Sequence, residues 1–336
     1  MKNPVLIEVT RGSLVESVHT GSIVLARPDG QHVLGLGDTT RTVFPRSAVK
    51  ALQALPLIES GAAERFGLGE DAIALACASH TGTARHAALA AAMLARLGLK
   101  EDALGCGAHA PLGTSAAREL WRSGSTPSQL HNNCSGKHAG MLAVAMHRGW
   151  PIEGYWLPDH PVQRLVHQIM RELTGLPLGQ DVMGIDGCSV PNWAMPLGTL
   201  AQVFAKLVSG EVLPPGRAAA MRRIMDACWA EPELVAGRGR ADSVVMAALP
   251  RRVFMKTGAE GVYCGGFPEF GLGFALKIDD GATRASAGAV MALIERVLPQ
   301  ARGLMHRNEI RSWRGLPAGA IRTAASLDAA LDGLRL

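Results

Sequence analysis

The segment that says most about the fold is residues 251–278, RRVFMKTGAEGVYCGGFPEFGLGFALKI. It contains three runs rich in β-forming residues, 251–256, 261–264 and 272–278, which are separated by turns that contain glycine. Consecutive strands that are joined by short turns pair antiparallel. The segment therefore predicts a β-meander in the last third of the chain.

A second strand-rich part lies near the N-terminus. Residues 22–26 and 32–36 flank Pro28-Asp29-Gly30, in which the proline presets φ and the glycine accepts a positive φ, so the pattern predicts a hairpin. An N-terminal hairpin and a C-terminal meander can share one sheet. We therefore expect an α+β protein, in which an antiparallel sheet from the N- and C-terminal segments packs with a helical middle region.

The expected organisation is a single domain over residues 1–336. Its strand-rich parts are 5–43 and 250–280, and its helical middle part is about 80–248. No internal repeat or low-complexity linker interrupts this arrangement.

Local patterns predict individual elements. Apolar residues at spacings of three and four predict a helix that starts near Ser47 and further helices over 83–98 and 286–298. The run 72–77, AIALAC, is interpreted as a buried strand. Residues 316–336 are interpreted as a loosely attached end.

The composition indicates a folded protein with a small binding partner. Of the 336 residues, 48% are hydrophobic and 19% charged, which excludes a disordered chain. The net charge of +5 is scattered along the sequence, and aromatic residues make up only 4%. Neither a basic stripe nor a stacking platform is present, so we expect no nucleic-acid partner.

The same reading predicts a cytoplasmic protein without membrane segments. No stretch approaches the ~18 consecutive apolar residues of a membrane-spanning helix, and no secretion signal is visible at the start. The six cysteines form no C-x-x-C pair, so we expect reduced thiols, some of which could bind a metal.

Ser47 and Lys50 form an S-x-x-K pair at the start of an expected helix. Residues three apart lie on one helix face, so the amine can accept the hydroxyl proton when the amine is neutral. Burial or a second cation nearby favours the neutral amine. The alternative is an N-cap serine followed by a solvated lysine, because so short a pattern is common by chance.

Lys256, Thr257 and Gly258 follow at the end of an expected strand. S-x-x-K combined with K-T-G is typical of penicillin-recognising serine enzymes, so a β-lactamase-like or peptidase-like acyl transferase is one candidate function. That group also has a serine or tyrosine two residues before an asparagine. No asparagine of this chain is preceded in that way, which counts against the candidate; the asparagines are at 3, 132, 133, 192 and 308.

Two further segments carry polar residues that packing does not explain. CASHTGT, residues 77–83, displays Ser79 and His80 after the expected buried strand, although an N-cap for the next helix is the alternative. HNNCSGKHAGML, residues 131–142, places polar residues before a helix that contains two glycines. Glycine lowers the helix propensity of this segment, so we expect close packing or a function to compensate for the lost stability.

HNNCSGKHAGML, with FPRSAVKALQALP before it and GIDGCSVPNWAMPL and MKTGAEGVYCG after it, resembles the rhizobial-type (class 3) L-asparaginases of the asparaginase II family. The resemblance extends from about residue 6 to about residue 298. Four segments in the same order are more specific than any one of them. The resemblance implies an amidohydrolase whose fold is similar to that of the serine β-lactamases.

The resemblance implies two serine–lysine tandems, Ser47 with Lys50 and Ser79 with Lys256. Ser47 would be the nucleophile and Lys50 its base, while Ser79 and Lys256 would complete the proton relay and hold charge near the oxyanion. Two amines crowded into one pocket cannot both easily keep their protons. The sequence leaves open how the two serines divide these roles.

The resemblance also implies a zinc ion that is held by two cysteines and a lysine, which match Cys134, Cys188 and Lys137. Spacing alone favours Cys134, His138 and Cys188, because residues four apart share a helix face and imidazole is the commoner ligand. We expect the lysine set, which should weaken as the pH falls because the amine must be deprotonated. Two buried cysteines without a metal are the alternative, and a role of zinc in catalysis or only in substrate binding is left open.

A free amino acid needs partners for its α-carboxylate and its α-ammonium. Arg46 could clamp the carboxylate, and Asp186 could bind the ammonium with His138 or Asn133. For each of these residues a structural hydrogen bond or a surface ion pair is the alternative.

These expectations combine into an L-asparaginase of asparagine catabolism, which hydrolyses the side-chain amide of L-asparagine to L-aspartate and ammonia through an acyl-enzyme on Ser47. Glutamine should be a poor substrate, because one extra methylene displaces its amide from the oxyanion donors. A zinc-dependent amino-acid-binding protein with vestigial serine–lysine pairs is a non-enzymatic alternative. The resemblance further implies a homodimer.

Overall fold

A computed structural model describes residues 2–305 and 309–336 and divides the chain into two compact units. Unit 1 consists of the residues up to Ala48, Met195–Val212 and the residues from Ala248 onward. Unit 2 consists of Val49–Ala194 and Leu213–Ala247. Each unit is formed by segments that are far apart in the sequence.

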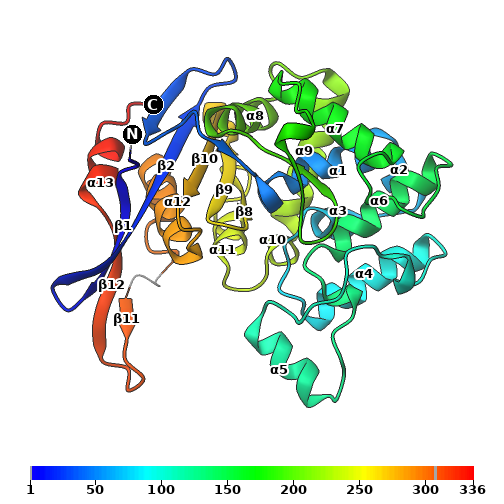
Figure 1. Ribbon diagram of the computed structural model, residues 1–336, viewed down its shortest axis with the longest axis horizontal. Coiled ribbons are helices and arrows are strands. Elements are labelled where there is room, and N and C mark those ends of the chain that lie inside the picture. The colour runs from blue at the N-terminus through cyan, green and yellow to red at the C-terminus, as the bar shows by residue number, and fades with distance from the viewer. Residues whose placement is uncertain (1, 306–308) are drawn as a thin grey trace. The chain divides into compact units, whose positions relative to one another are not determined.

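Unit 1 is built on an antiparallel sheet (Figure 1). Among the described residues the sheet has eight strands in the order β11-β12-β1-β2-β10-β9-β8, and β3 pairs with β2. Its strands are β1 (Val5–Arg11), β2 (Leu14–Ala26), β3 (His32–Leu36), β8 (Phe254–Gly258), β9 (Val262–Phe267), β10 (Leu272–Ile278), β11 (Glu309–Arg311) and β12 (Pro317–Thr323). A short pair, β4 (Thr42–Val43) with β7 (Met195–Pro196), also belongs to unit 1.

The pairing confirms the main sequence prediction. The N-terminal hairpin β2–β3 and the C-terminal meander β8–β9–β10 lie in one sheet, because β2 pairs antiparallel with β10. The register sets Ala26 opposite Gly273 and Gly21 opposite Ile278. The α+β class that we expected from the sequence is therefore confirmed.

Helices cover both faces of this sheet. The helix α8 (Leu197–Ser209) packs so closely that a Cβ atom on Gly273 would lie 2.1 Å from the Ala205 nitrogen. On the opposite face, Gly288 of α12 (Thr283–Val297) lies against Ile7. Residues of β10 and β1 that alternate between the faces complete a dry core on each side of the sheet.

The C-terminal end is attached firmly, which corrects the expectation of a loose end for 316–336. The strand β12 pairs with β1, with Val9 opposite Ile321. The helix α13 (Ala325–Asp332) buries Leu327 and Leu331. Sequence reasoning missed this because no residue of β12 is fully buried and several are small, so its hydrophobic pattern is weak.

Unit 2 is mostly helical. Its helices are α1 (Lys50–Glu59), α2 (Ala62–Arg65), α3 (Glu70–Ala76), α4 (Ala84–Arg96), α5 (Thr114–Arg122), α6 (Ser135–His147), α7 (Pro161–Thr174), α9 (Pro215–Ala230), α10 (Pro232–Val235) and α11 (Ala241–Ala248). It also holds the small hairpin of β5 (Met183–Ile185) and β6 (Pro191–Trp193). The 3₁₀ turns of the chain are η1 (Arg46–Val49), η2 (Glu101–Ala103), η3 (Gln129–His131), η4 (Gln180–Val182), η5 (Pro268–Phe270) and η6 (Pro299–Ala301).

The expected buried strand over 72–77 is wrong, because these residues form most of helix α3 and its C-cap. Periodicity cannot separate a short buried helix from a buried strand. Alanine has the highest helix propensity, and two acidic residues, Glu70 and Asp71, occupy the first turn, where the helix dipole favours them. The expected helices near Ser47, over 83–98 and over 286–298 are confirmed as η1 with α1, as α4 and as α12.

The glycines of HNNCSGKHAGML are explained by close packing of α6 on α3. A Cβ atom on Gly136 would lie 2.3 Å from the Leu75 carbonyl oxygen, which no side chain can tolerate. Gly140 faces Ala76 at ordinary contact distance. Helix α6 therefore lies directly against the end of α3, where the segment with Ser79 begins.

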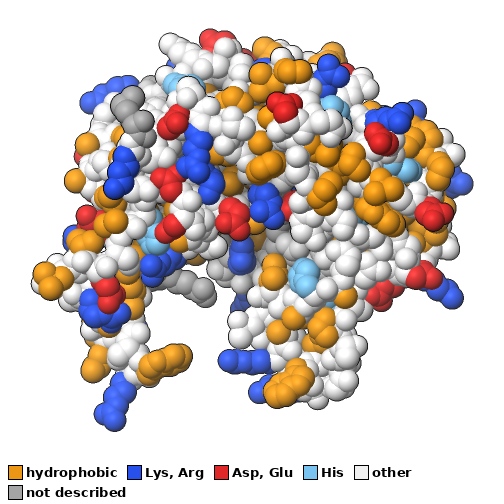
Figure 2. All heavy atoms as spheres, in the orientation of Figure 1, with side chains coloured by type: hydrophobic (Ala, Val, Ile, Leu, Met, Phe, Trp, Pro, Cys, Tyr) orange, Lys and Arg blue, Asp and Glu red, His pale blue; other side chains and the backbone are white. Residues whose placement is uncertain are grey.

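The surface is mixed in charge. Figure 2 shows Lys and Arg side chains interspersed with Asp and Glu over the face in view. Within the described residues, no helix is both long and apolar enough to cross a bilayer.

Candidate active site

Ser47 lies in unit 1, in the 3₁₀ turn η1 that precedes α1. The residue before it, Arg46, has φ of +52°, a left-handed conformation that is uncommon for a residue with a side chain. Such strained positions are concentrated at functional sites. The turn is closed by the Ala48 N–H, which donates to the Pro45 carbonyl at 3.1 Å.

The K-T-G segment lies beside this turn, in the same unit. A Cβ atom on Gly258 would be 2.7 Å from the Pro45 oxygen and 3.3 Å from the Ala48 nitrogen, so glycine is needed there for close approach of two backbones. Unit 1 therefore brings the end of β8 against the turn that carries Ser47.

Lys256 lies on β8, two residues before this contact. Its side chain is fully buried, and Nζ donates to the Thr257 carbonyl at 2.8 Å. On the neighbouring strand β9, Cys264 is its cross-strand partner. An amine buried in a sheet is unusual, since lysine is almost never fully buried without a partner.

Lys50 is the first residue of α1 and lies in unit 2. Its side chain is also fully buried. Nζ donates to two main-chain carbonyls, those of Ala78 and Asn133, the second at 3.2 Å. In the part of the chain that the structure describes, no carboxylate forms an ion pair with this amine.

Ser79 directly follows Ala78, whose carbonyl accepts from Lys50. Its N–H donates to the Val235 carbonyl at 2.8 Å, which fixes the backbone. Its hydroxyl, however, is buried and has no hydrogen-bond partner among the described residues. An unsatisfied buried hydroxyl costs about 1–3 kcal/mol, so this group needs an explanation.

Cys134, Lys137 and Cys188 converge in unit 2. Lys137 Nζ donates to the Cys188 sulfur at 3.0 Å, and all three side chains are buried. The hydrogen bond from Cys134, followed by the charge of Lys137, lowers the pKa of Cys188 to about 4. The same hydrogen bond, together with burial, raises the pKa of Cys134 to about 12. Cys188 is therefore a thiolate paired with the Lys137 ammonium.

These three side chains fit a metal by the chemistry of their donors. Cys188 is hydrogen-bonded to both Lys137 and Cys134, and thiolate and nitrogen are donors that zinc prefers. The described residues contain no group of three or more His, Cys, Asp and Glu side chains that could hold a metal ion, so lysine is needed to complete a set of three. All six cysteines are free of disulfide bonds, as expected.

His138 lies next to this cluster but is held by a different partner. Tyr155 accepts a hydrogen bond from the Gly105 N–H at 2.8 Å, and its hydroxyl lies 2.7 Å from His138 Nδ1. The Tyr155 hydroxyl and His138 Nδ1 therefore form a hydrogen bond, in which the tautomer of the ring decides which of the two is the donor. Burial, with the charge of Lys137, lowers the pKa of His138 to about 3. The result is a neutral ring. Its Nε2 is buried and forms no well-shaped hydrogen bond among the described residues, although the main chain of Cys188 lies near enough to oppose the fall in pKa.

The remaining predicted residues differ in how they are placed. Asn133 precedes the cluster, and its N–H donates to His109 Nε2 at 3.0 Å. Asp186 begins the tight loop that carries Cys188, and the loop is closed by the Ser189 N–H on the Asp186 carbonyl at 2.8 Å. Arg46 lies in unit 1 beside Ser47.

A sequence model of the family L-asparaginase II matches residues 7–323 of the chain. The chain belongs to the L-asparaginase II family. This membership makes it an asparaginase-type hydrolase with a small-molecule substrate, as the four motif segments had indicated. No curated protein matches it at a significant level.

Solved structures resemble this L-asparaginase II family member weakly. A β-lactamase from Mycobacterium bovis is 13% identical over 84% of this chain and 94% of its own, with a TM-score of 0.39. EstCE1, a hydrolase with promiscuous acyltransferase activity, is 14% identical over 85% and 93%, with a TM-score of 0.40. Mglu, in its tris and glutamate form, is 15% identical over 90% of this chain and 64% of its own, with a TM-score of 0.39. At these values the likenesses carry no argument about function.

The predicted residues of this family member fall into two groups. Unit 1 holds Arg46, Ser47 and Lys256, and unit 2 holds the others, which are Lys50, Ser79, Asn133, Cys134, Lys137, His138, Asp186 and Cys188. Sequence reasoning missed Tyr155, which fixes the ring of His138. Tyrosine occurs only twice in the chain, and this scarcity was the one signal that could have singled it out.

Proposed function

We propose that the protein is an L-asparaginase that hydrolyses the side-chain amide of L-asparagine to L-aspartate and ammonia. The observation that carries the proposal is the buried Lys50 amine, which follows Ser47 by one helical turn and donates to two carbonyls. A neutral amine has two N–H groups and one lone pair. Two carbonyl acceptors engage both N–H groups and leave the lone pair to accept a proton.

In the proposed reaction, the Ser47 oxygen attacks the amide carbon while Lys50 Nζ takes the hydroxyl proton. The tetrahedral intermediate collapses when the carbon–nitrogen bond breaks and that proton passes to the departing nitrogen, which leaves as ammonia. Water then attacks the β-aspartyl ester, one of its protons returns to Ser47, and aspartate is released. We assign Ser79 and Lys256 to the proton relay and to stabilising the oxyanion, as the resemblance implies.

Substrate recognition is proposed for the polar groups around the cluster. His138 Nε2, which forms no well-shaped hydrogen bond among the described residues, would donate to a carboxylate or an amide oxygen of the substrate in the tautomer that carries the proton there. Arg46 would bind the α-carboxylate, and Asp186, with Asn133, would bind the α-ammonium. The buried, unpaired hydroxyl of Ser79 supports a ligand that supplies its missing partner.

Cys134, Lys137 and Cys188 would hold a zinc ion, whose bound form would supply a fixed positive charge that polarises substrate oxygens. Lys137 carries a proton in its pair with the Cys188 thiolate, so metal binding would have to displace it. A homodimer is proposed from the resemblance alone, and light scattering of the purified protein measures it.

Ammonia release from L-asparagine by the purified protein and by Ser47→Ala tests the proposal. We expect release by the wild type, a loss of at least about a thousandfold in the variant with an unchanged circular dichroism spectrum, and poor turnover of glutamine. Full activity of Ser47→Ala would refute the nucleophile. Hydrolysis of a chromogenic β-lactam, or asparagine binding without ammonia release, would favour the two alternatives.

A further inference from the structure

His80 is a buried residue that the proposed reaction does not use. Its side chain is fully buried. The Gly82 N–H donates to Nδ1 at 3.1 Å, so Nδ1 is unprotonated and the ring proton is on Nε2. Nε2 lies 2.9 Å from the Ser135 hydroxyl oxygen and therefore donates to it. The orientation of the ring is thus fixed at both nitrogens.

The environment keeps this ring neutral. His80 stacks on His86, with ring centroids 4.7 Å apart and planes inclined by 8°. Burial, followed by the neighbouring His86 and Lys50, holds the pKa of His80 well below its usual range. A neutral ring with one donor and one acceptor satisfies both of its partners over the working pH range.

The ring joins the two chain segments that hold the Lys50 amine. One segment runs from Ala78 to Gly82, and the other is the start of α6, from Asn133 to Ser135. The backbone N–H of His80 donates to the Asn133 carbonyl at 3.4 Å. The ring of His80 binds the hydroxyl of Ser135, two residues after Asn133. Ala78 and Asn133 supply the two carbonyls that accept from Lys50 Nζ. The His80 side chain thus bridges the two segments that carry these carbonyls, beside the main-chain bond between them.

We propose that His80 is a positioning residue, which fixes the two carbonyl acceptors of Lys50 through its hydrogen bond to Ser135 and so directs the lone pair of the amine. The inference rests on the proposed role of Lys50 as the base. It assigns the imidazole no contact with substrate, and no proton leaves it during the reaction.

The competing explanation is that His80 only fills space. His86 provides a matched control, since it is the other ring of the stack and is also buried. His86 instead caps α4 with Thr83 and approaches the Glu233 carbonyl at 3.2 Å, so it has no bond to the Lys50 acceptors. The same substitution at the two rings separates packing from positioning.

The test compares His80→Gln, His80→Asn and His86→Asn. The amide nitrogen of glutamine reaches the place of imidazole Nε2 and can donate to Ser135, whereas that of asparagine is too short. We expect kcat for asparagine to fall by about tenfold to a hundredfold in His80→Asn with little change in KM, because a displaced base slows chemistry more than binding. His80→Gln should recover most of kcat, and His86→Asn should keep kcat within about twofold while it lowers the melting temperature.

Equal kcat in His80→Asn and wild type, or an equal loss in His86→Asn, would overturn the inference. A wild type that releases no ammonia from asparagine would instead contradict the proposed function. Crystal structures of His80→Asn and His80→Gln then decide the positioning role by themselves. The inference predicts that Lys50 loses one carbonyl in the first and keeps both in the second, and it fails if both contacts persist in the first.

Discussion

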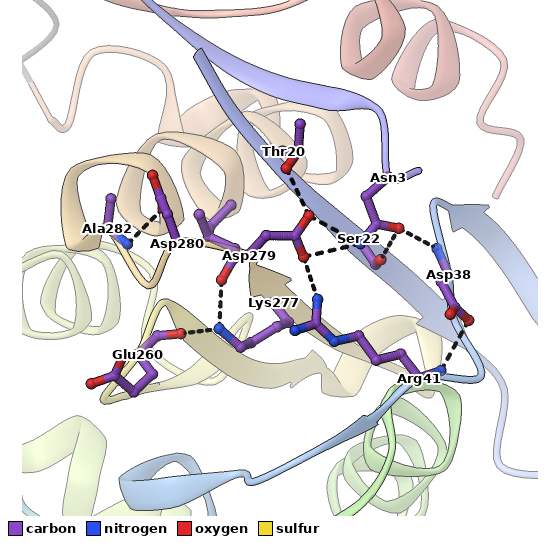
Figure 3. Close-up of polar contacts among 11 residues, drawn as sticks. Asn3, Thr20, Ser22, Asp38, Arg41, Glu260, Lys277, Asp279, Asp280 and Ala282 are labelled. Atoms are coloured by element: carbon purple, nitrogen blue, oxygen red, sulfur yellow. Dashed lines mark hydrogen bonds and ion pairs between the residues drawn. The ribbon is translucent and has the colours of Figure 1, made fainter. Parts of the chain in front are cut away.

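Two polar clusters of this chain differ in how far their polar groups are hydrogen-bonded. The first lies in unit 2 and consists of the residues described above, Lys50, Ser79, Cys134, Lys137, His138 and Cys188. The second lies in unit 1 around Asp279, where the sheet meets the loop before β4 (Figure 3). Comparing them shows which polar residues the fold needs for itself.

The Asp279 cluster is fully paired. Its carboxylate accepts from Asn3 at 3.0 Å, from Thr20 at 2.7 Å and from the guanidinium of Arg41 (Figure 3). Burial alone would raise the pKa of Asp279, but these hydrogen bonds outweigh it and lower the pKa. Lys277 donates to the carbonyls of Glu260, at 2.6 Å, and Ile278, at 2.5 Å. The bonds of Asp279 to Asn3, Thr20 and Arg41 tie strands and loops of unit 1 together.

The cluster of unit 2 leaves groups unpaired although it is drier. The Ser79 hydroxyl and His138 Nε2 form no well-shaped hydrogen bond among the described residues. Each such group costs stability, so a chain under selection for stability alone would remove it. We infer that the paired cluster serves the fold and that the unpaired one serves the chemistry. The predictions below test this difference.

The largest effect is expected from Lys50, with Lys277 as its control. Lys50→Met should lower kcat by about a hundredfold to ten-thousandfold, since it removes the proposed general base. Lys277→Met removes an amine that also donates to two carbonyls, and it should leave kcat within about twofold. Steady-state ammonia release measures both, and similar losses in the two variants would break the comparison.

Zinc content should depend on Cys134 and Cys188 of unit 2. Protein purified without chelator should contain about one zinc per chain, and Cys134→Ala and Cys188→Ala should each lose it because a ligand is missing. Cys228→Ala, at a buried cysteine of α9 outside the cluster, should keep it. Elemental analysis decides, and a metal-free wild type that stays metal-free after incubation with zinc would refute the site.

Ser79→Ala should separate activity from stability. The hydroxyl has no partner, so its removal should leave the free energy of unfolding unchanged or raise it by about 1 kcal/mol. Because the hydroxyl is assigned to the proton relay, kcat should nevertheless fall by about tenfold or more. Urea unfolding and ammonia release are measured on the same preparation. Lost stability with full activity would mean that Ser79 is a structural residue.

Asp279→Asn should show the opposite pattern. At pH 7 it should lower the free energy of unfolding by about 1–3 kcal/mol, since it weakens hydrogen bonds to a charged group, and it should leave kcat unchanged. A carboxyl whose pKa is lowered in the folded state adds stability above its unfolded pKa, near ~4, and loses it as the pH falls. The difference from wild type should therefore shrink below about pH 4. A difference that is constant with pH would contradict the role of the charge.

The sequence predicted the sheet better than the helical unit for identifiable reasons. The strands 254–258, 262–267 and 272–278 are clear runs of β-forming residues, and turns that contain glycine separate them. Their antiparallel pairing could therefore be inferred. The prediction of a strand at 72–77 failed because a short, apolar, alanine-rich run suits a buried helix as well as a buried strand. The end of the chain failed because β12 is stabilised by its pairing with β1 rather than by its own pattern.

The site was predicted unevenly as well. Motifs and the family resemblance indicated the lysines, serines and cysteines, and membership of the L-asparaginase II family is now shown. The hydrogen bond of Tyr155 to His138 joins residues 17 apart in the sequence, and only the fold brings them together. Unpaired atoms such as the Ser79 hydroxyl depend on every neighbour of the group, so no sequence pattern could predict them.

The most direct measurement is mass spectrometry of the wild type, Ser47→Ala and Ser79→Ala after rapid acid quench during turnover of L-asparagine. We predict a β-aspartyl ester on the peptide that contains Ser47 in the wild type and in Ser79→Ala, and none in Ser47→Ala. An ester on Ser79, or full turnover by Ser47→Ala, would contradict this prediction.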